Sequence, residues 1–219
     1  MAPKKHRKRR SPTEAKRLLI ETARAALVEG GGDLEMTEVA ARAGVSEGLA
    51  YYHFGNKAGL LDAVVRDFYD RLDESVMAVP FPGDTWVERE RARIGEFVRL
   101  LYEDPVAPLV INVLRVNPAL HAEERERRRR LNALGARNIL QAQRDGEICA
   151  DHNPKTLVAM LLGGVMAGVT EALSENPRKP LAETQEVAFG FVMRAAGVSE
   201  SDAAAQRRRK NERNGILQN

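Results

Sequence analysis

Residues 36–65 read "MTEVAARAGVSEGLAYYHFGNKAGLLDAVV", and this stretch decides the fold. Thr37 is predicted to be the N-cap of a short helix that runs to Gly44. Ser46 is predicted to cap a second short helix, so only a tight glycine-containing turn fits between the two. Two short helices joined in this way, behind a longer helix, form a helix-turn-helix arrangement.

The longer helix is predicted from the preceding stretch, "SPTEAKRLLIETARAALVEGGG". Ser11 at the N-cap, Pro12 at the first helical position and Glu14 three residues after the serine form a capping box. The glycines at 30–32 end the helix. The alternative interpretation of "EGGGD" as a nucleotide-binding loop is disfavoured, because the glycines follow a helix rather than a strand.

The second short helix has an unusual outward face. At about 100° per residue, Ala50 and Phe54 point toward the core, and Gly48, Leu49 and Tyr52 point away from it. A recognition helix in the major groove needs such an outward surface. Leu49 can contact a thymine methyl group, and the missing side chain of Gly48 lets the backbone approach the bases.

Glu47 has two interpretations. Its carboxylate can accept a hydrogen bond from a cytosine amino group, or it can simply stabilise the positive end of its own helix. Tyr51, Tyr52 and His53 are candidates for phosphate contact. Tyr51 and His53 can instead pack against the neighbouring helices.

Lys57 is a further candidate for phosphate contact. Asn56 is predicted to cap the next helix, so that the free amides of this helix and the Lys57 ammonium meet one phosphate. A solvated surface lysine is the alternative. The helix itself carries apolar residues at helical spacing and ends before "PFPG" at 80–83.

Residues 36–65 resemble the DNA-binding signature of the TetR family of transcriptional regulators. The shared features are the capped helix, the Ala-Gly-Val-Ser turn, the aromatic end of the recognition helix and the Asn-Lys pair. Ala50 departs from the larger aliphatic residue that is usual in the family. The resemblance implies a DNA-facing set of Thr37, Ser46, Glu47, Gly48, Leu49, Tyr51, Tyr52, His53 and Lys57.

The fold class that we expect is all-α: an N-terminal three-helix helix-turn-helix DNA-binding domain, then a helical ligand-binding and dimerisation domain. Alternating runs rich in Val, Ile and Thr are missing, so strands have little support. The DNA-binding domain is predicted at 11–55 and the effector-binding and dimerisation domain at 56–198, which begins with a linking helix at 56–79. A disordered basic arm is predicted before them, at 1–10, and a disordered basic tail after them, at 199–219.

The resemblance implies that the second domain binds a small effector. Apolar and polar residues of its central helices are candidates for lining that site. They are Trp86, Phe97, Leu101, Asn112, Val113, Asn117, His121, Asn138 and Met166. Each of them can equally be an ordinary core or surface residue.

The resemblance also implies a homodimer in which two C-terminal helices of each protomer form a four-helix interface. "TLVAMLLGGVMAGVTEAL", from residue 156, and "VAFGFVMRAA", from residue 187, are the apolar helices that fit this role. A purely intramolecular core is the alternative. The expected interface residues are Leu161, Gly164, Val165, Gly168, Ala188, Phe191, Val192 and Ala195.

Charge and composition agree with a DNA-binding regulator. The net charge of +3 conceals basic runs at 4–10 and 207–213 and an acidic body between them, which suits a polyanionic partner. The segment "EERERRRR" at 123–130 is interpreted as a solvated helix face. The only cysteine, Cys149, excludes an intramolecular disulfide and fits the bacterial cytoplasm, with nucleoid association when DNA is bound.

We expect no enzymatic activity, cofactor, metal site or membrane partner. The four histidines lack metal-ligand spacing, and neither a phosphate loop nor a nucleophile elbow is present. The function that we expect is a dimeric repressor that binds a palindromic operator and is released by a small molecule. The alternatives are an activator, an effector-independent architectural DNA-binding protein, and a helical small-molecule enzyme.

Overall fold

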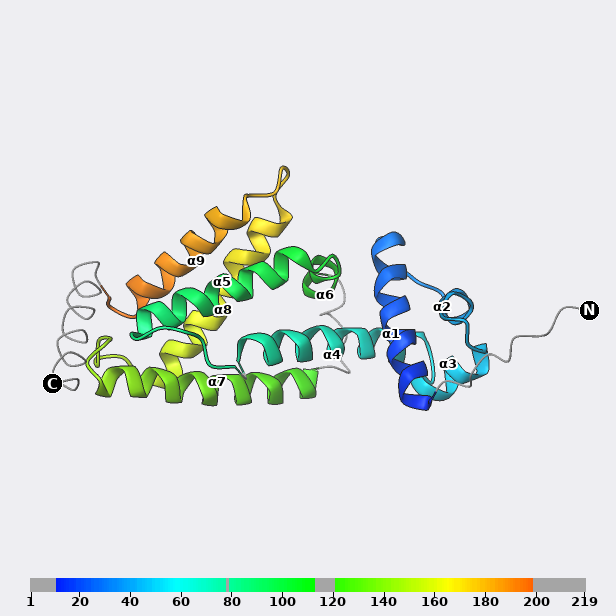
Figure 1. The fold of residues 1–219 in the computed structure, drawn as a ribbon, viewed down its shortest axis with the longest axis horizontal. Coiled ribbons are helices and arrows are strands. Elements are labelled where there is room, and N and C mark those ends of the chain that lie inside the picture. The colour runs from blue at the N-terminus through cyan, green and yellow to red at the C-terminus, as the bar shows by residue number, and fades with distance from the viewer. Residues whose placement is uncertain (1–10, 78, 113–120, 199–219) are drawn as a thin grey trace, which may run out of the picture. The chain divides into compact units, whose positions relative to one another are not determined.

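A computed structural model describes residues 11–77, 79–112 and 121–198 of the chain, with the side chains of 112 and 121–123 left out. Within these residues there are nine α-helices and no strand, which confirms the all-α prediction (Figure 1). The helices are α1 (Pro12–Glu29), α2 (Met36–Ala43), α3 (Glu47–Phe54), α4 (Lys57–Val76), α5 (Trp86–Glu103), α6 (Ala107–Asn112), α7 (His121–Arg144), α8 (Pro154–Ser174) and α9 (Leu181–Ala195).

The helices form two compact units, and the division between them falls within α4. The first unit contains the described residues up to Asp70 and the part of α6 from Leu109. The second unit contains the described residues from Arg71 to Pro108 and those from α7 onward. The predicted basic arm and tail, and the effector candidates Val113 and Asn117, lie outside the described residues.

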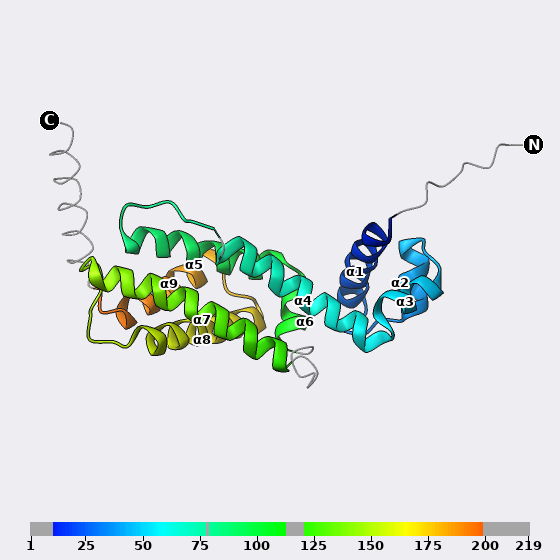
Figure 2. The same ribbon diagram turned by 90° about the horizontal axis from the view of Figure 1, so that it is seen from below.

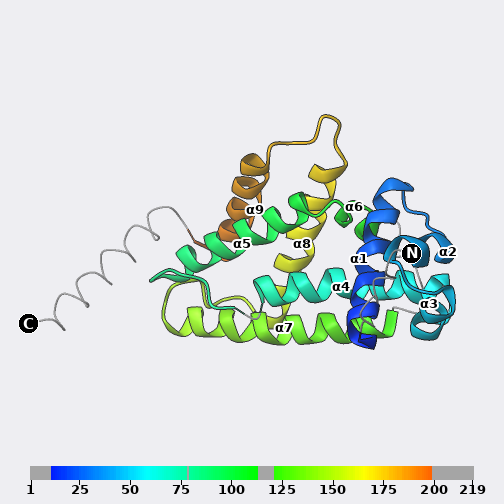
Figure 3. The same cartoon turned by 45° about the vertical axis from the view of Figure 1, so that its right-hand side comes forward.

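In the first unit, α1 lies beside both α2 and α3 (Figure 3). The predicted capping box at its start is confirmed, because Ser11 Oγ accepts a hydrogen bond from the Glu14 N–H and Glu14 Oε2 accepts one from the Ser11 N–H. Leu19 and Leu27 of α1 are completely buried. Helix α1 is therefore the support against which the two short helices pack.

The turn between α2 and α3 depends on Gly44. This residue has a φ of 62° and a ψ of 42°, a left-handed conformation that glycine adopts without the steric cost of a side chain. Its N–H donates to the Ala40 and Ala41 carbonyls and so closes the end of α2. Ser46 then caps α3 as predicted, with its Oγ accepting from the Leu49 N–H at 3.3 Å.

The prediction that Thr37 caps α2 is wrong. The helix begins one residue earlier, at Met36, and the N-cap is Glu35, which makes no side-chain capping bond. Met36 is buried, as are Val39 and Ala40 on the same face. Packing of this apolar face, rather than a cap, therefore stabilises the first turn.

In the second unit, α8 packs against both α7 and α9, and α5 packs against α9 (Figure 2). The approach of α7 and α8 is close at Gly135, where a Cβ atom would lie 2.2 Å from Val158 Cγ2. Helix α8 is also the one described helix that is long and apolar enough to cross a membrane. It contacts two neighbouring helices, and 39% of its apolar window is buried.

One residue of the predicted solvated face on α7 is an exception. Arg127 reaches Asp73 of α4 with two hydrogen bonds, of 2.8 Å from Nε and 2.6 Å from Nη2. Both side chains are largely buried. The charge pattern of this segment did not indicate the pair, because Asp73 lies more than 50 residues earlier in the chain.

The ion pair between Arg24 of α1 and Asp67 of α4 generates a prediction about stability. Arg24 Nη1 lies 3.2 Å from Asp67 Oδ2, and both side chains are mostly buried. Changing Asp67 to Asn removes the carboxylate charge that faces the mostly buried Arg24 guanidinium, so we expect the free energy of unfolding to fall by about 1–2 kcal/mol. Urea denaturation monitored by circular dichroism measures this loss.

The control is Glu21→Gln, which breaks the exposed pair that Arg17 makes with Glu21 within α1. Exposed pairs at this spacing contribute only about 0.3–0.5 kcal/mol. Equal losses for the two substitutions would contradict the assignment of a structural role to the Arg24–Asp67 pair.

Candidate nucleic-acid interface

Helix α3 presents its aromatic side chains to solvent. Tyr52 is 80% exposed and Tyr51 is 44% exposed, whereas Ala50 on the opposite face is completely buried. Glu47 and Gly48 are also exposed. The predicted orientation of the helix is confirmed for these residues, and Glu47 and Gly48 lie at its N-terminal end, the part of a recognition helix that meets base edges.

The other recognition-face candidates differ in exposure. Leu49, predicted to point outward, and Phe54, predicted to point toward the core, are both half-buried, so neither prediction is clearly met. Thr37 and Ser46 are exposed, and Ser46 also uses its hydroxyl group to cap α3. A capping hydroxyl group keeps acceptor and donor capacity for a phosphate or a base edge.

His53 is less accessible than the tyrosines beside it. Its Nε2 atom is buried and has no hydrogen-bond partner. The imidazole ring stands edge-on to the Tyr52 ring, with 5.4 Å between the ring centroids. The buried Nε2 atom favours the alternative that His53 packs within the protein. Tyr51 and Tyr52 are exposed and can contact a phosphate.

Helix α4 begins directly beside the end of α3. Asn56 caps it as predicted, with Oδ1 accepting from the Gly59 N–H at 2.9 Å. A Cβ atom at Gly59 would lie 2.0 Å from the Phe54 carbonyl oxygen, so only glycine allows this approach. Lys57, in the first turn of α4, is consequently held close to the recognition helix.

Lys57 has two acidic neighbours that no sequence pattern indicated. Its Nζ lies 2.5 Å from Asp33 Oδ1 and 3.4 Å from Glu35 Oε1. The hydrogen bond with Asp33 raises the pKa of Lys57, and the same bond lowers the pKa of Asp33. Lys57 is therefore a charged group at the interface whose charge is already partly compensated.

The effector candidates in the second unit with described side chains are either buried or half-buried. Trp86 and Leu101 are almost completely buried, and Phe97 and Met166 are half-buried. The side chains of Asn112 and His121 lie outside the described part of the chain. No ligand site is tested by these positions, and the assignment stays a prediction.

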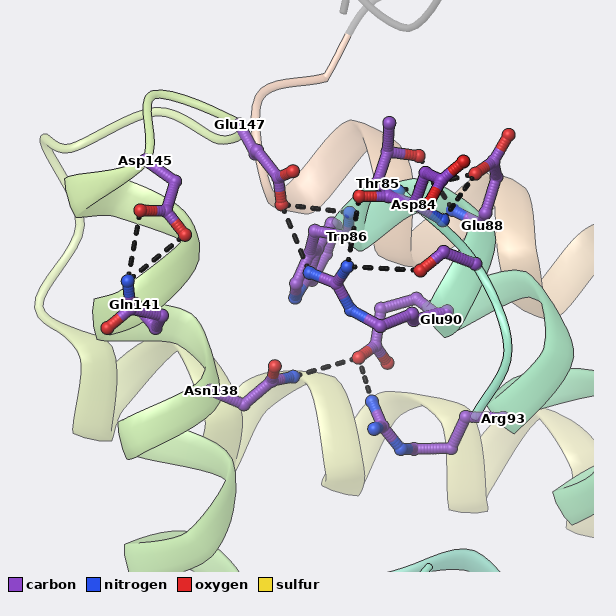
Figure 4. A network of polar contacts seen from close by, with 12 residues as sticks. Asp84, Thr85, Trp86, Glu88, Glu90, Arg93, Asn138, Gln141, Asp145 and Glu147 are labelled. Atoms are coloured by element: carbon purple, nitrogen blue, oxygen red, sulfur yellow. Dashed lines mark hydrogen bonds and ion pairs between the residues drawn. The ribbon is translucent and has the colours of Figure 1, made fainter. Parts of the chain in front are cut away.

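A buried polar network joins the start of α5 to α7 and to the loop after α7 (Figure 4). The Trp86 backbone N–H donates to Glu147 Oε2 at 2.8 Å. The buried Glu90 carboxylate accepts from Asn138 Nδ2 at 2.8 Å and from Arg93. Asn138 is therefore held by a protein carboxylate, and Trp86 Nε1 is buried with no hydrogen-bond partner.

The candidates for a dimer interface separate into two groups. Leu161, Ala188 and Val192 are buried within the single chain. Gly164 faces the Phe191 ring of the same chain, because a Cβ atom there would lie 2.6 Å from Phe191 Cζ. Val165 and Ala195 are half-buried, and Gly168 is exposed.

Two exposed apolar residues on the same helices were not predicted. Met160 of α8 is 65% exposed and Val187 of α9 is 63% exposed, and Phe191 is partly exposed as well. Exposed apolar side chains mark an interaction site where they form a contiguous patch, whereas single ones are common on monomer surfaces. Predicting the exposure of these residues requires knowing how α8 packs on α9, and helical periodicity alone does not give that packing.

Within the described residues, no group of three or more His, Cys, Asp and Glu side chains could hold a metal ion. The chemistry available at the interface is instead hydrogen bonding and charge. Exposed hydroxyl groups, a solvent-facing end of α3 and a lysine at the start of the next helix are the features of a helix-turn-helix DNA-binding protein.

The family follows from comparison with known proteins. Residues 19–64 match the family described as "Bacterial regulatory proteins, tetR family". No curated protein matches the chain. The match covers α2 and α3 completely and confirms the resemblance read from residues 36–65, so this part of the chain is a TetR-family DNA-binding domain.

Solved structures have the same fold over most of the chain. A TetR-family regulator from Pectobacterium atrosepticum is 25% identical, with a TM-score of 0.68 over 86% of this chain and 96% of that one. SmeT, the repressor of the Stenotrophomonas maltophilia multidrug efflux pump SmeDEF, is 23% identical, with a TM-score of 0.67 over 88% of this chain and 95% of that one. The fatty acid degradation regulator FadR from Bacillus halodurans is 17% identical, with a TM-score of 0.67 over 84% of this chain and 96% of that one.

The glycines of the interface generate a second prediction. Changing Gly59 to Ala places a methyl group against the Phe54 carbonyl oxygen, which backbone geometry cannot relieve, so we expect a loss of about 1–3 kcal/mol in the free energy of unfolding. DNA binding should weaken as α4 moves away from α3. Chemical denaturation and fluorescence anisotropy with labelled duplex DNA measure the two effects.

Gly48→Ala is the matched control, because no atom lies within 4 Å of a Cβ at this exposed helical position. We expect unchanged or higher stability, since alanine favours a helix over glycine by about 1 kcal/mol. DNA binding should still weaken, because the new methyl group stands between the helix and the bases. Stability lost at Gly48 and retained at Gly59 would contradict both assignments.

Proposed function

We propose that the protein is a dimeric one-component transcriptional repressor that binds a palindromic operator and is released by a small-molecule effector. The observation that supports this proposal most directly is the exposed outer face of α3, in a domain that matches the TetR family. The DNA-contacting residues in this proposal are Thr37, Ser46, Glu47, Gly48, Leu49, Tyr51, Tyr52, His53 and Lys57.

The proposed roles of these residues follow from their positions. Leu49, Glu47 and Gly48 lie on the first turn of α3 and would contact base edges. Tyr51, Tyr52 and Lys57 would contact phosphates and fix the register of the helix on the duplex. His53 would join them only through a movement of its ring, because its Nε2 atom is buried.

A homodimer is the second part of the proposal. The exposed apolar side chains Met160, Val187 and Phe191 on α8 and α9 support it, together with the small exposed residues Gly163 and Gly168. Small residues let a second pair of helices approach closely. Two recognition helices related by a two-fold axis can read the two halves of a palindrome when they lie about 34 Å apart or at a multiple of that distance.

Effector release is the third part. We assign residues 11–55 to DNA binding and residues 56–198 to effector binding and dimerisation. A ligand that binds more tightly to a form with a different spacing of the heads would lower DNA affinity by that difference in binding free energy. SmeT is a repressor and FadR is a regulator, which supports the same class of function for this chain.

The same proposal places the protein in the bacterial cytoplasm and, when bound to its operator, at the nucleoid. A regulator without catalytic activity is favoured over an enzyme, because the family match and the fold both describe a transcription factor. DNA, a second copy of the chain and an effector are the proposed partners.

Selection of bound sequences from a pool of random duplexes tests the operator part. At near-physiological salt we expect a palindromic consensus. Changing Leu49 to Ala should alter the preferred base at one position of each half-site, because it removes the apolar contact with a base edge, and should cost about 1–3 kcal/mol at that position. An unaltered consensus would remove Leu49 from base readout, and salt-sensitive retention without a consensus would favour an architectural protein.

The oligomeric state tests the interface. Changing Val187 to Glu places a charge in the proposed contact, so we expect the dimer to dissociate to monomers in analytical ultracentrifugation. Leu134→Glu is the matched control, because Leu134 is an exposed apolar residue of α7 and does not belong to the proposed surface on α8 and α9. A dimer that survives Val187→Glu would exclude this face as the interface.

A further inference from the structure

The loop between α1 and α2 carries two carboxylates that hold the DNA-facing lysine. Asp33 Oδ1 and Glu35 Oε1 lie 2.5 Å and 3.4 Å from Lys57 Nζ, and we call these two residues the acidic pair. The contact links positions more than 20 residues apart. It is therefore a product of the fold and not of local sequence.

Asp33 is held in place by its own backbone surroundings. The Gly30 N–H donates to the Ala26 carbonyl and ends α1. A Cβ atom at Gly30 would lie 2.4 Å from the Asp33 carbonyl oxygen, so the loop returns tightly on the end of the helix. Asp33 Oδ1 also accepts a hydrogen bond from the N–H of the buried Leu34, at 2.9 Å. The carboxylate therefore points to Lys57 without a large entropic cost.

Lys57 is held from the other side by the cap of α4. Asn56 Oδ1 accepts from the Gly59 N–H and fixes the first turn of the helix, so the lysine backbone cannot move independently. Its side chain is 38% exposed, which leaves part of the ammonium group accessible. The acidic pair and a DNA phosphate would consequently compete for the same three ammonium donors.

We propose that the acidic pair is an internal competitor that occupies Lys57 in the free protein and lowers its affinity for DNA phosphates regardless of sequence. This inference rests on the proposed DNA-binding function. Asp33 and Glu35 act through Lys57 and are positioning residues. A phosphate that takes Lys57 leaves two carboxylates behind, which repel the backbone and attract cations from solution.

A salt dependence follows from this competition. A lysine that meets a phosphate releases about 0.9 of a counterion from duplex DNA. When the lysine leaves a carboxylate at the same time, cation uptake by the carboxylates offsets part of that release. Lys57 should therefore contribute less than its full share to the salt slope in the native protein, and its full share once the acidic pair is neutral.

A double-mutant cycle on the full chain tests the proposal. The variants are native protein, D33N/E35Q, K57A and the triple substitution, each titrated against the same labelled duplex at several salt concentrations. We expect D33N/E35Q to bind roughly threefold more tightly at low salt, to operator and unrelated duplexes alike. In the K57A background the gain should disappear apart from the effect of net charge.

E21Q/D70N measures that net-charge effect, because it removes two carboxylate charges from side chains of the same unit that are not ion-pair partners of Lys57. A gain for D33N/E35Q that exceeds the control, is lost in K57A and is accompanied by a steeper salt slope would support the proposal. A gain no larger than that of the control, or one retained in K57A, would overturn it.

The proposed function fails in a different way from this inference. Native protein that shows no salt-dependent binding to any duplex would refute DNA binding itself. Native protein that binds DNA, with no coupling between the acidic pair and Lys57, would refute only the competition. Thermal denaturation of each variant confirms that the amide replacements, which keep the shape of the side chains, leave the fold intact.

Discussion

The close packing of alanine side chains between α1, α2 and α3 is the constraint on which the proposed interface depends. Ala23, Ala40, Ala43 and Ala50 are all buried where these helices meet. A methyl group is the smallest side chain that still buries apolar surface, so the helix backbones approach one another and leave little freedom to rotate. With Ala50 held in the core, Tyr51 and Tyr52 of α3 lie at the solvent face.

Charge is distributed so that this face is accessible but not strongly attractive. The body of the chain is acidic, and the lysine at the start of α4 is compensated by carboxylates from the preceding loop. Uncompensated cations increase binding to every DNA sequence, whereas discrimination comes from base contacts. A partly neutralised phosphate contact would therefore favour operator selectivity over total affinity.

Sequence-based prediction succeeded where the deciding interaction joins residues close in the chain, and it failed where that interaction is tertiary. Ser11, Ser46 and Asn56 were correctly assigned as caps, because each bonds to a backbone group three residues away. Thr37 was assigned wrongly, since burial of Met36, a tertiary effect, determines where α2 begins. Periodicity also could not tell the buried Leu161 from the exposed Met160, because both belong to an almost entirely apolar helix.

The amino-acid sequence by itself determined the all-helical class, the helix-turn-helix and the outward face of α3, because caps, glycine turns and helical spacing act over a few residues. Only the tertiary structure decided the partners of Lys57, the burial of Arg127 against Asp73 and the apolar surface left uncovered on α8 and α9. These features join residues far apart in the chain, and their geometry exists only after the helices have packed.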